Sequence, residues 1–130
     1  IKLKINNQIK LYKKYQNFFL KNKIFGFPKI RVNSRIKDAV SMFNLVVRKR
    51  NKLINIFKKR KIPFKIYYPK PLYKQYKLKN KIRLKNTEFL CKSVISLPFN
   101  DLSEKRFNVI KNHLKKIIIN DKKIFFEKKI

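Results

Sequence analysis

The sequence predicts an α+β fold, a two-layer small domain in which a short mixed or antiparallel sheet is covered by helices. Three observations support this prediction. The chain has 130 residues, which is enough for one core and too little for two domains, so residues 1–130 are predicted to form a single domain. Hydrophobic residues make up 44% of the chain, so a packed core can form. Helical and strand-like patterns alternate along the chain, and five prolines punctuate it.

The N-terminal half is predicted to alternate between helix and strand. Residues 7–22 carry apolar side chains at helical spacing, so they are predicted to form a helix, and a turn at Gly26 follows. Residues 42–48 alternate in the manner of a strand that is buried on one face and partly on the other. Asn51 is predicted to cap a second helix, because asparagine is a favoured N-cap residue. The basic run at 58–61 then suits the negative end of that helix.

The next segments are predicted to be shorter. Residues 64–68 read as a strand that stops at a proline, and residues 69–85 read as a loop with many lysines. A short helix is predicted over 87–94, with Asn86 as its N-cap. A turn is predicted at 96–98, where a proline follows serine and leucine.

The last helix has the clearest sequence signal. Asp101 and Glu104 are spaced as a capping box, so Asp101 is predicted as the N-cap. The helix then buries one apolar stripe, which consists of Phe107, Ile110, Leu114 and Ile117. Residues 120–130 are predicted either to form a terminal strand or to fray.

The charge of the chain has two interpretations. Lys and Arg number 37 and Asp and Glu number 6, which gives a net charge of +31. Such a charge favours a polyanionic partner such as nucleic acid. However, 30 of the basic residues are lysines and only 7 are arginines. Because Lys, Ile, Asn, Phe and Tyr all have A/T-rich codons, a biased genome explains the same composition.

Several classes of protein are excluded by single residues. Cys91 is the one cysteine, so neither an internal disulfide nor a cysteine-built zinc site can form, and a reducing compartment is expected. Gly26 is the one glycine, which excludes glycine-rich phosphate-binding loops. No apolar run is long enough to span a bilayer, and no secretory signal is visible. Because the chain begins with Ile1, we expect it to be a fragment of a longer polypeptide.

Two motifs are more specific than composition. The first reads Tyr68-Pro69-x-Pro71-Leu72-x-x-Gln75, and the second, about twenty residues later, reads Ser96-Leu97-Pro98. In this order and spacing the chain resembles the C-terminal small domain of the DegT/DnrJ/StrS family of nucleotide-sugar aminotransferases, from about Gln8 to Ile119. It departs from the family pattern at Tyr73, where the family has histidine, and at Lys61, where it has glycine.

The resemblance implies a function for the whole protein. Family members are pyridoxal-phosphate enzymes that transfer an amino group from an amino acid to a nucleotide-linked keto sugar, and they act as homodimers. The Schiff-base lysine and the other cofactor contacts belong to a large N-terminal domain that these 130 residues do not include. The small domain closes one side of the active site. The isolated chain is therefore expected to be inactive, and the intact protein is expected in the cytoplasm.

Four residues are predicted to bind the substrate, namely Tyr68, Lys70, Tyr73 and Gln75. Tyr73 and Gln75 lie in the predicted loop, where functional contacts concentrate, and tyrosine hydroxyls suit a sugar or phosphate. The alternative for Tyr68 is a strand residue that packs into the core. No catalytic, cofactor-binding or metal-binding residue is assigned. Two alternatives remain for the whole chain: a stand-alone basic RNA-binding protein of ribosomal type, and a degenerate remnant of the enzyme.

Overall fold

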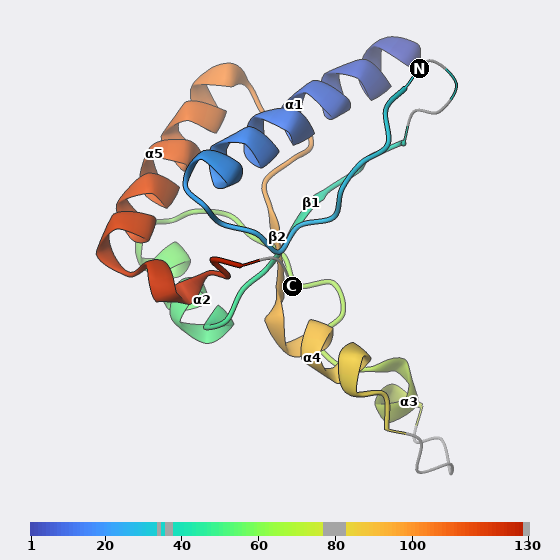
Figure 1. Ribbon diagram of the computed structural model, residues 1–130, viewed down its shortest axis with the longest axis vertical. Helices are drawn as coiled ribbons and strands as arrows, with labels where there is room; N and C mark the ends of the chain where they lie inside the picture. Colours follow the sequence, from blue (N-terminus) through green and yellow to red (C-terminus); the bar gives the residue numbers. More distant parts are fainter. Residues whose placement is uncertain (34, 36–37, 77–82, 129–130) are drawn as a thin grey trace.

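The computed structural model describes residues 1–33, 35, 38–76 and 83–128. Helices cover one face of a two-stranded antiparallel sheet, which confirms the predicted fold class (Figure 1). The described elements, in chain order, are α1 (Lys2–Lys21), β1 (Phe43–Val46), α2 (Arg50–Lys59), α3 (Leu72–Gln75), α4 (Lys85–Ser93), β2 (Val94–Leu97), α5 (Glu104–Asn120) and the 3₁₀ turn η1 (Lys122–Ile124). None of the described helices is long and apolar enough to cross a membrane.

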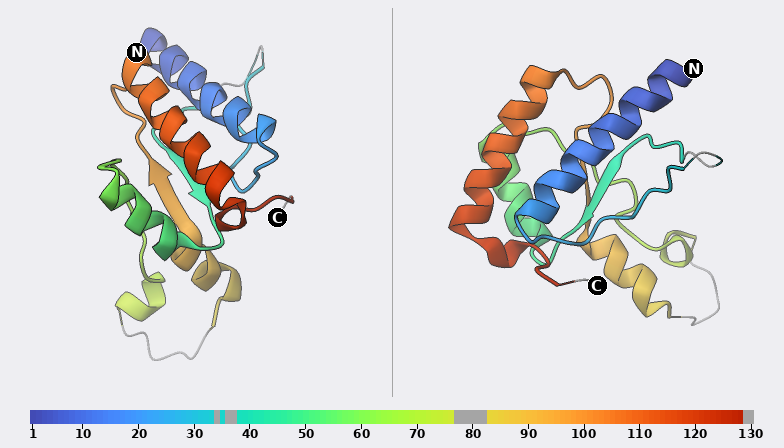
Figure 2. Two further views of the ribbon diagram at one scale, coloured as in Figure 1. Left: turned by 90° about the vertical axis from the view of Figure 1, so that its left-hand side faces the viewer. Right: turned by 45° about the horizontal axis from the view of Figure 1, so that its top comes forward.

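The sheet has two unlike faces. Its register pairs Phe43 with Leu97 and Leu45 with Ile95, and these four side chains are buried. Successive strand residues point to opposite faces, so the intervening pairs, Asn44↔Ser96 and Val46↔Val94, lie on the other face. Helices α1, α2 and α5 pack against the first face, as Figure 2 shows. The second face therefore carries no layer from these three helices.

The core is built around aromatic rings. The Phe43 ring on β1 lies 4.8 Å from that of Tyr12, 4.9 Å from that of Tyr15 and 5.8 Å from that of Phe19, measured between centroids. These three residues repeat along α1 at the spacing that predicted a helix there. The predicted apolar stripe of α5 is also buried, with Leu114 fully so. Periodicity therefore identified the core faces of both long helices correctly.

Three predicted elements are shifted or shorter. The first helix begins at Lys2, five residues before its predicted start, and α2 has Lys49 as its N-cap rather than Asn51. Asn51 lies inside α2 and is exposed. The predicted strand at 64–68 reduces to one bridge, in which Lys65 exchanges two backbone hydrogen bonds with Ser96. A short edge segment beside a two-stranded sheet has no second partner that would extend the pairing.

The segment 84–97 differs most from its prediction. Helix α4 has Leu84 rather than Asn86 as its N-cap, and it ends at Ser93. The predicted turn at 96–98 is wrong, because Val94–Leu97 forms β2. The stretch pairs with β1, which lies about fifty residues earlier, and this partner is invisible to local patterns. The predicted loop over 69–85 contains the single helical turn α3, and its residues 77–82 lie outside the described part.

Helix α5 begins where the sequence predicted, but a different residue is its N-cap. Ser103 is the N-cap, and its hydroxyl oxygen accepts a hydrogen bond from the Arg106 backbone N–H at 3.3 Å. Asp101 has φ = 52°, so it lies in a left-handed turn conformation that a short polar side chain tolerates. Glu104 forms an ion pair with Lys14 of α1 instead of closing a capping box.

The C-terminal segment packs against the core over its described residues. Ile124 and Phe125 are buried, and single antiparallel bridges join Phe125 to Val47 and Phe126 to Phe25. The segment thus forms neither a regular strand nor a frayed end between residues 122 and 126. It contacts the chain just after β1, where the Arg48 backbone N–H donates to the Ile124 oxygen, whereas the Val46 N–H of β1 itself donates to the Gly26 oxygen.

Candidate functional site

The second face of the sheet forms the floor of the candidate site. There the Ser96 hydroxyl donates a hydrogen bond to the side-chain oxygen of Asn44, so the strands present a polar pair at their centre. A hollow of about 270 Å³ lies over this pair, between α4 and the segment that carries Tyr67 and Tyr68. Pockets that enclose a ligand usually measure about 300–1,000 Å³. The hollow is therefore slightly smaller than the usual range of ligand pockets.

A second hollow lies farther along the same face. It measures about 530 Å³ and is lined mainly by apolar groups, among them Phe27, Val46, Phe89 and Leu90. Val46 is two residues from Asn44 on β1, so the two hollows share one face of the strand. Phe89 and Leu90 are exposed apolar residues on α4. This sheet face and α4 together make a largely apolar, concave surface.

The structure places the four predicted site residues on one segment, but their side chains do not meet at one point. Tyr68 is 76% exposed at the rim of the smaller hollow, so the alternative that it packs into the core is wrong. Lys70 is also exposed. The Gln75 side-chain amide donates to the backbone oxygen of Lys70 at 2.8 Å. Tyr73 is half-buried and donates its hydroxyl proton to the carboxylate of Glu88 at 2.6 Å.

Glu88 is a residue that sequence reasoning did not assign to any site. It lies in the first turn of α4 and is only 8% exposed. Besides the Tyr73 hydroxyl, its carboxylate contacts Lys74 Nζ at 3.2 Å and Arg83 Nε at 3.3 Å. The hydrogen bond from Tyr73, with that from Lys74, lowers the pKa of Glu88 to about 2. The same hydrogen bond to Glu88 is the main reason that the pKa of Tyr73 is raised.

The Glu88 cluster fixes the predicted substrate segment to α4. Tyr73 and Lys74 both belong to α3, so one carboxylate holds this turn against the helix that flanks the hollow. The only sequence signal for Glu88 is its rarity, as one of six acidic residues in the chain. Two of its partners, Lys74 and Tyr73, lie 14 and 15 positions earlier, beyond the reach of any helical spacing.

Glu88→Gln is expected to flatten the dependence of stability on pH in acid. The folded-state pKa of Glu88 is about 2 and its ordinary value is 4.5, so between these values the unfolded chain binds more protons. The stability that this carboxylate contributes is therefore complete above about pH 4.5 and is lost as the pH falls towards 2. Denaturant unfolding at several pH values measures this loss, which should be smaller in the variant than in the wild type.

Glu127→Gln is the matched control for this experiment. Glu127 is exposed and forms no ion pair with the described residues. This control should keep the wild-type slope of unfolding free energy against pH. Equal slopes for Glu88→Gln and the wild type would show that the cluster does not stabilise the fold.

Arg50 connects the helical layer to the site. It is the first residue of α2, and its Nη1 donates to the backbone oxygens of Cys91 at 2.6 Å and Val94 at 3.2 Å. These acceptors lie at the junction of α4 and β2, where a helix leaves carbonyls without internal partners. Burial lowers the pKa of Arg50. Its Nε is the one buried side-chain N or O atom without a hydrogen-bond partner among the described residues.

These features define a small α+β domain with one packed and one open sheet face, the latter carrying shallow hollows. The chain belongs to the DegT/DnrJ/EryC1/StrS aminotransferase family, whose sequence profile matches residues 1–114. The predicted family resemblance is thereby confirmed.

A solved structure shares the fold. The chain is similar to a DegT DnrJ EryC1 StrS aminotransferase from Brucella abortus, with a TM-score of 0.73 and 21% sequence identity. The match covers 88% of this chain and 31% of that one, so the chain spans about a third of the length of this relative. No match was found among curated proteins.

The described residues do not form a pyridoxal-phosphate site. A Schiff-base lysine must reach an enclosed pocket, whereas every described lysine is exposed or half-buried at the surface. Lys29 lines the larger hollow, but no carboxylate lines it with Lys29 that could pair with a pyridine nitrogen. No chemical step is therefore assigned to residues of this chain.

Proposed function

We propose that this chain is the C-terminal domain of a pyridoxal-phosphate-dependent aminotransferase that aminates a nucleotide-linked keto sugar. The observation that carries the proposal is the family match over residues 1–114, joined to a fold shared with an aminotransferase three times as long. The amino donor is an amino acid, the intact protein is a cytoplasmic homodimer, and polypeptide outside these 130 residues holds the cofactor.

In this proposal the open sheet face closes one side of the substrate pocket. The hollow of about 270 Å³ above Asn44 and Ser96 is too small to enclose a nucleotide sugar, which suits a wall completed by another domain. Tyr68 presents a hydroxyl at its rim, and exposed Lys70 follows two residues later on the same segment with an ammonium group; these groups suit a sugar and a diphosphate. Gln75 orients the Lys70 backbone, and Tyr73 is held by Glu88.

The first test is the intact mass of the native polypeptide from its source cells. A mass of roughly 40 kDa or above is expected, because a domain of at least usual size must be added to hold the cofactor. The purified native protein should also carry pyridoxal phosphate that borohydride reduction fixes to a lysine. A native mass equal to that of the 130-residue chain would overturn the proposal.

The second test addresses the predicted binding residues in the native enzyme. Tyr68→Phe and Lys70→Ala are expected to raise KM for the nucleotide sugar by roughly tenfold each while kcat changes little. Each substitution removes a contact that binds the substrate equally well in the ground state and in the transition state. Tyr76→Phe is the matched control for Tyr68→Phe, since Tyr76 is similarly exposed on the same segment but, unlike Tyr68, does not line the smaller hollow. If Tyr68→Phe and Lys70→Ala behave like this control, the open face is not the substrate wall.

A further inference from the structure

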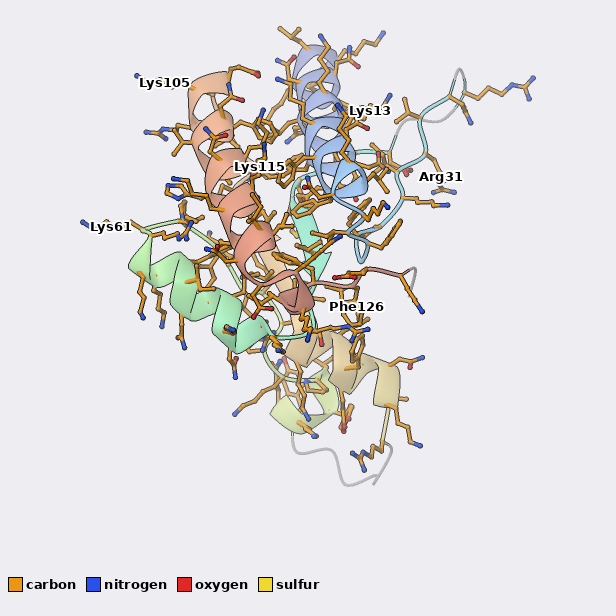
Figure 3. The ribbon with its side chains drawn as sticks, turned by 60° about the vertical axis from the view of Figure 1, so that its left-hand side comes forward. Lys13, Arg31, Lys61, Lys105, Lys115 and Phe126 are labelled. Atoms are coloured by element: carbon orange, nitrogen blue, oxygen red, sulfur yellow. The ribbon has the colours of Figure 1, made fainter. Side chains whose placement is uncertain are left out.

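We propose that the groove between α1 and α5 binds the phosphodiester backbone of single-stranded RNA. This second binding surface lies on the outer side of the helical layer and does not depend on the function proposed for the open sheet face. In Figure 3 the two helices lie side by side, and lysines such as Lys13, Lys105 and Lys115 project from them. The inter-helix groove itself has a volume of about 620 Å³.

Positive charge lines both walls of the groove. α1 contributes Lys14 and Lys21, and α5 contributes Lys111 and Lys115. The first two are seven positions apart and the second two are four apart, so the backbone positions of each pair lie on one helix face about 10 Å and about 6 Å apart along the axis. The two rows run in the same direction, because α1 and α5 run the same way (Figure 2). Two parallel rows of cations provide a track for one chain of phosphates.

The negative charge in the groove is already paired. Glu104 is the one acidic residue among those that line it, and it forms its ion pair with Lys14. The remaining three lysines have no carboxylate partner among the described residues. Positive charges crowded together without counter-ions repel one another, and a polyanion relieves this repulsion by replacing condensed small ions.

The polar groups between the lysines distinguish nucleic acid from a membrane surface. Four asparagines line the groove, namely Asn17, Asn22, Asn108 and Asn112. Side-chain amides donate hydrogen bonds to phosphate oxygens and accept them from the 2′-hydroxyl of ribose. Half-buried Phe18 also lines the groove and offers a ring on which a base can stack. A membrane-binding helix instead exposes a continuous apolar face, which this concave surface lacks.

The test compares two triple variants that remove the same charge. The groove variant is Lys21→Gln, Lys111→Gln and Lys115→Gln. The control variant is Lys58→Gln, Lys59→Gln and Lys92→Gln, which are exposed lysines on α2 and α4. Binding of each 130-residue chain to a fluorescent mixed-sequence 12-nucleotide RNA is measured by anisotropy across a salt series. Circular dichroism verifies that the exposed substitutions leave the helices intact.

The expected result is a difference in salt dependence as well as affinity. Each phosphate contact contributes about 0.7 to the logarithmic salt slope for a single strand, so contacts to the three lysines without a carboxylate partner predict a roughly 20-fold loss between about 50 and 200 mM salt. The groove variant lacks all three lysines, so it should bind more weakly and lose much less affinity over this range. The control should follow the wild type. Equal losses in both variants would show diffuse attraction by net charge and would overturn the proposal.

Two further outcomes also decide the matter. If the wild-type chain binds vesicles that contain phosphatidylserine but not the RNA, the surface is not a nucleic-acid site.

In an NMR titration with the RNA, the side-chain amide signals of Asn17 and Asn112 should shift before those of Asn55 on α2, which lines no part of the groove. Uniform shifts would contradict the proposal. Because the groove lies away from Tyr68 and Lys70, its variants should retain aminotransferase activity in the native enzyme.

Discussion

Phe43→Ala is expected to lower the free energy of unfolding by about 3–5 kcal/mol, as large aromatic-to-alanine changes in cores do. Phe43 is fully buried, and its ring lies within 6 Å of those of Tyr12, Tyr15, Phe19 and Phe27. Alanine would leave a cavity between β1 and α1 that the rigid rings cannot fill. Since domains are stable by only about 5–15 kcal/mol, this loss is a large fraction of the total stability. Urea denaturation followed by circular dichroism measures the loss.

The control for this substitution is Val109→Ala on α5. Val109 is half exposed and lies off the buried stripe, so its truncation should cost less than about 0.5 kcal/mol. A small cost at Phe43 would mean that β1 does not pack against α1 as described. The proposed substrate wall would then lose its support, because Asn44 is the next residue of the same strand.

Arg50→Ala is expected to have the second-largest effect, a loss of about 2 kcal/mol in unfolding free energy. The guanidinium group donates to two backbone oxygens at the end of α4, and hydrogen bonds to charged groups contribute about 1.5–3 kcal/mol. The substitution removes the link between α2 and the α4–β2 junction, so the loss should be greatest in α4. Thermal unfolding measures the total loss, and amide exchange locates it.

Asn51→Ala is the neighbouring control and separates two interpretations of α2. If Asn51 were the N-cap, as its sequence position predicted, its truncation would cost about 1 kcal/mol. The structure places it inside the helix and exposed, so alanine should be neutral or slightly stabilising. A loss at Asn51 as large as that at Arg50 would contradict the described start of α2.

The candidate site was only partly predictable. The segment from Tyr68 to Gln75 was identified from its motif, and the structure exposes Tyr68 beside a hollow. Glu88 was not identified, because an acidic residue in the first turn of a helix is expected on electrostatic grounds alone. Its contacts with Tyr73 and Lys74 depend on how α3 folds back on α4, which no local pattern encodes. The open sheet face was likewise visible only once β2 was paired.

Local patterns were enough to predict the α+β class, both long helices and their buried stripes, because helical periodicity is a property of neighbouring residues. The sequence also indicated the family, through two motifs that occur in the family's order and spacing. Three features became visible only in the folded chain: Val94–Leu97 is a strand, Ser103 rather than Asp101 caps α5, and Glu88 holds the predicted substrate segment. Each of these depends on a backbone angle or on a partner distant in sequence, and such contacts are set only when the chain packs.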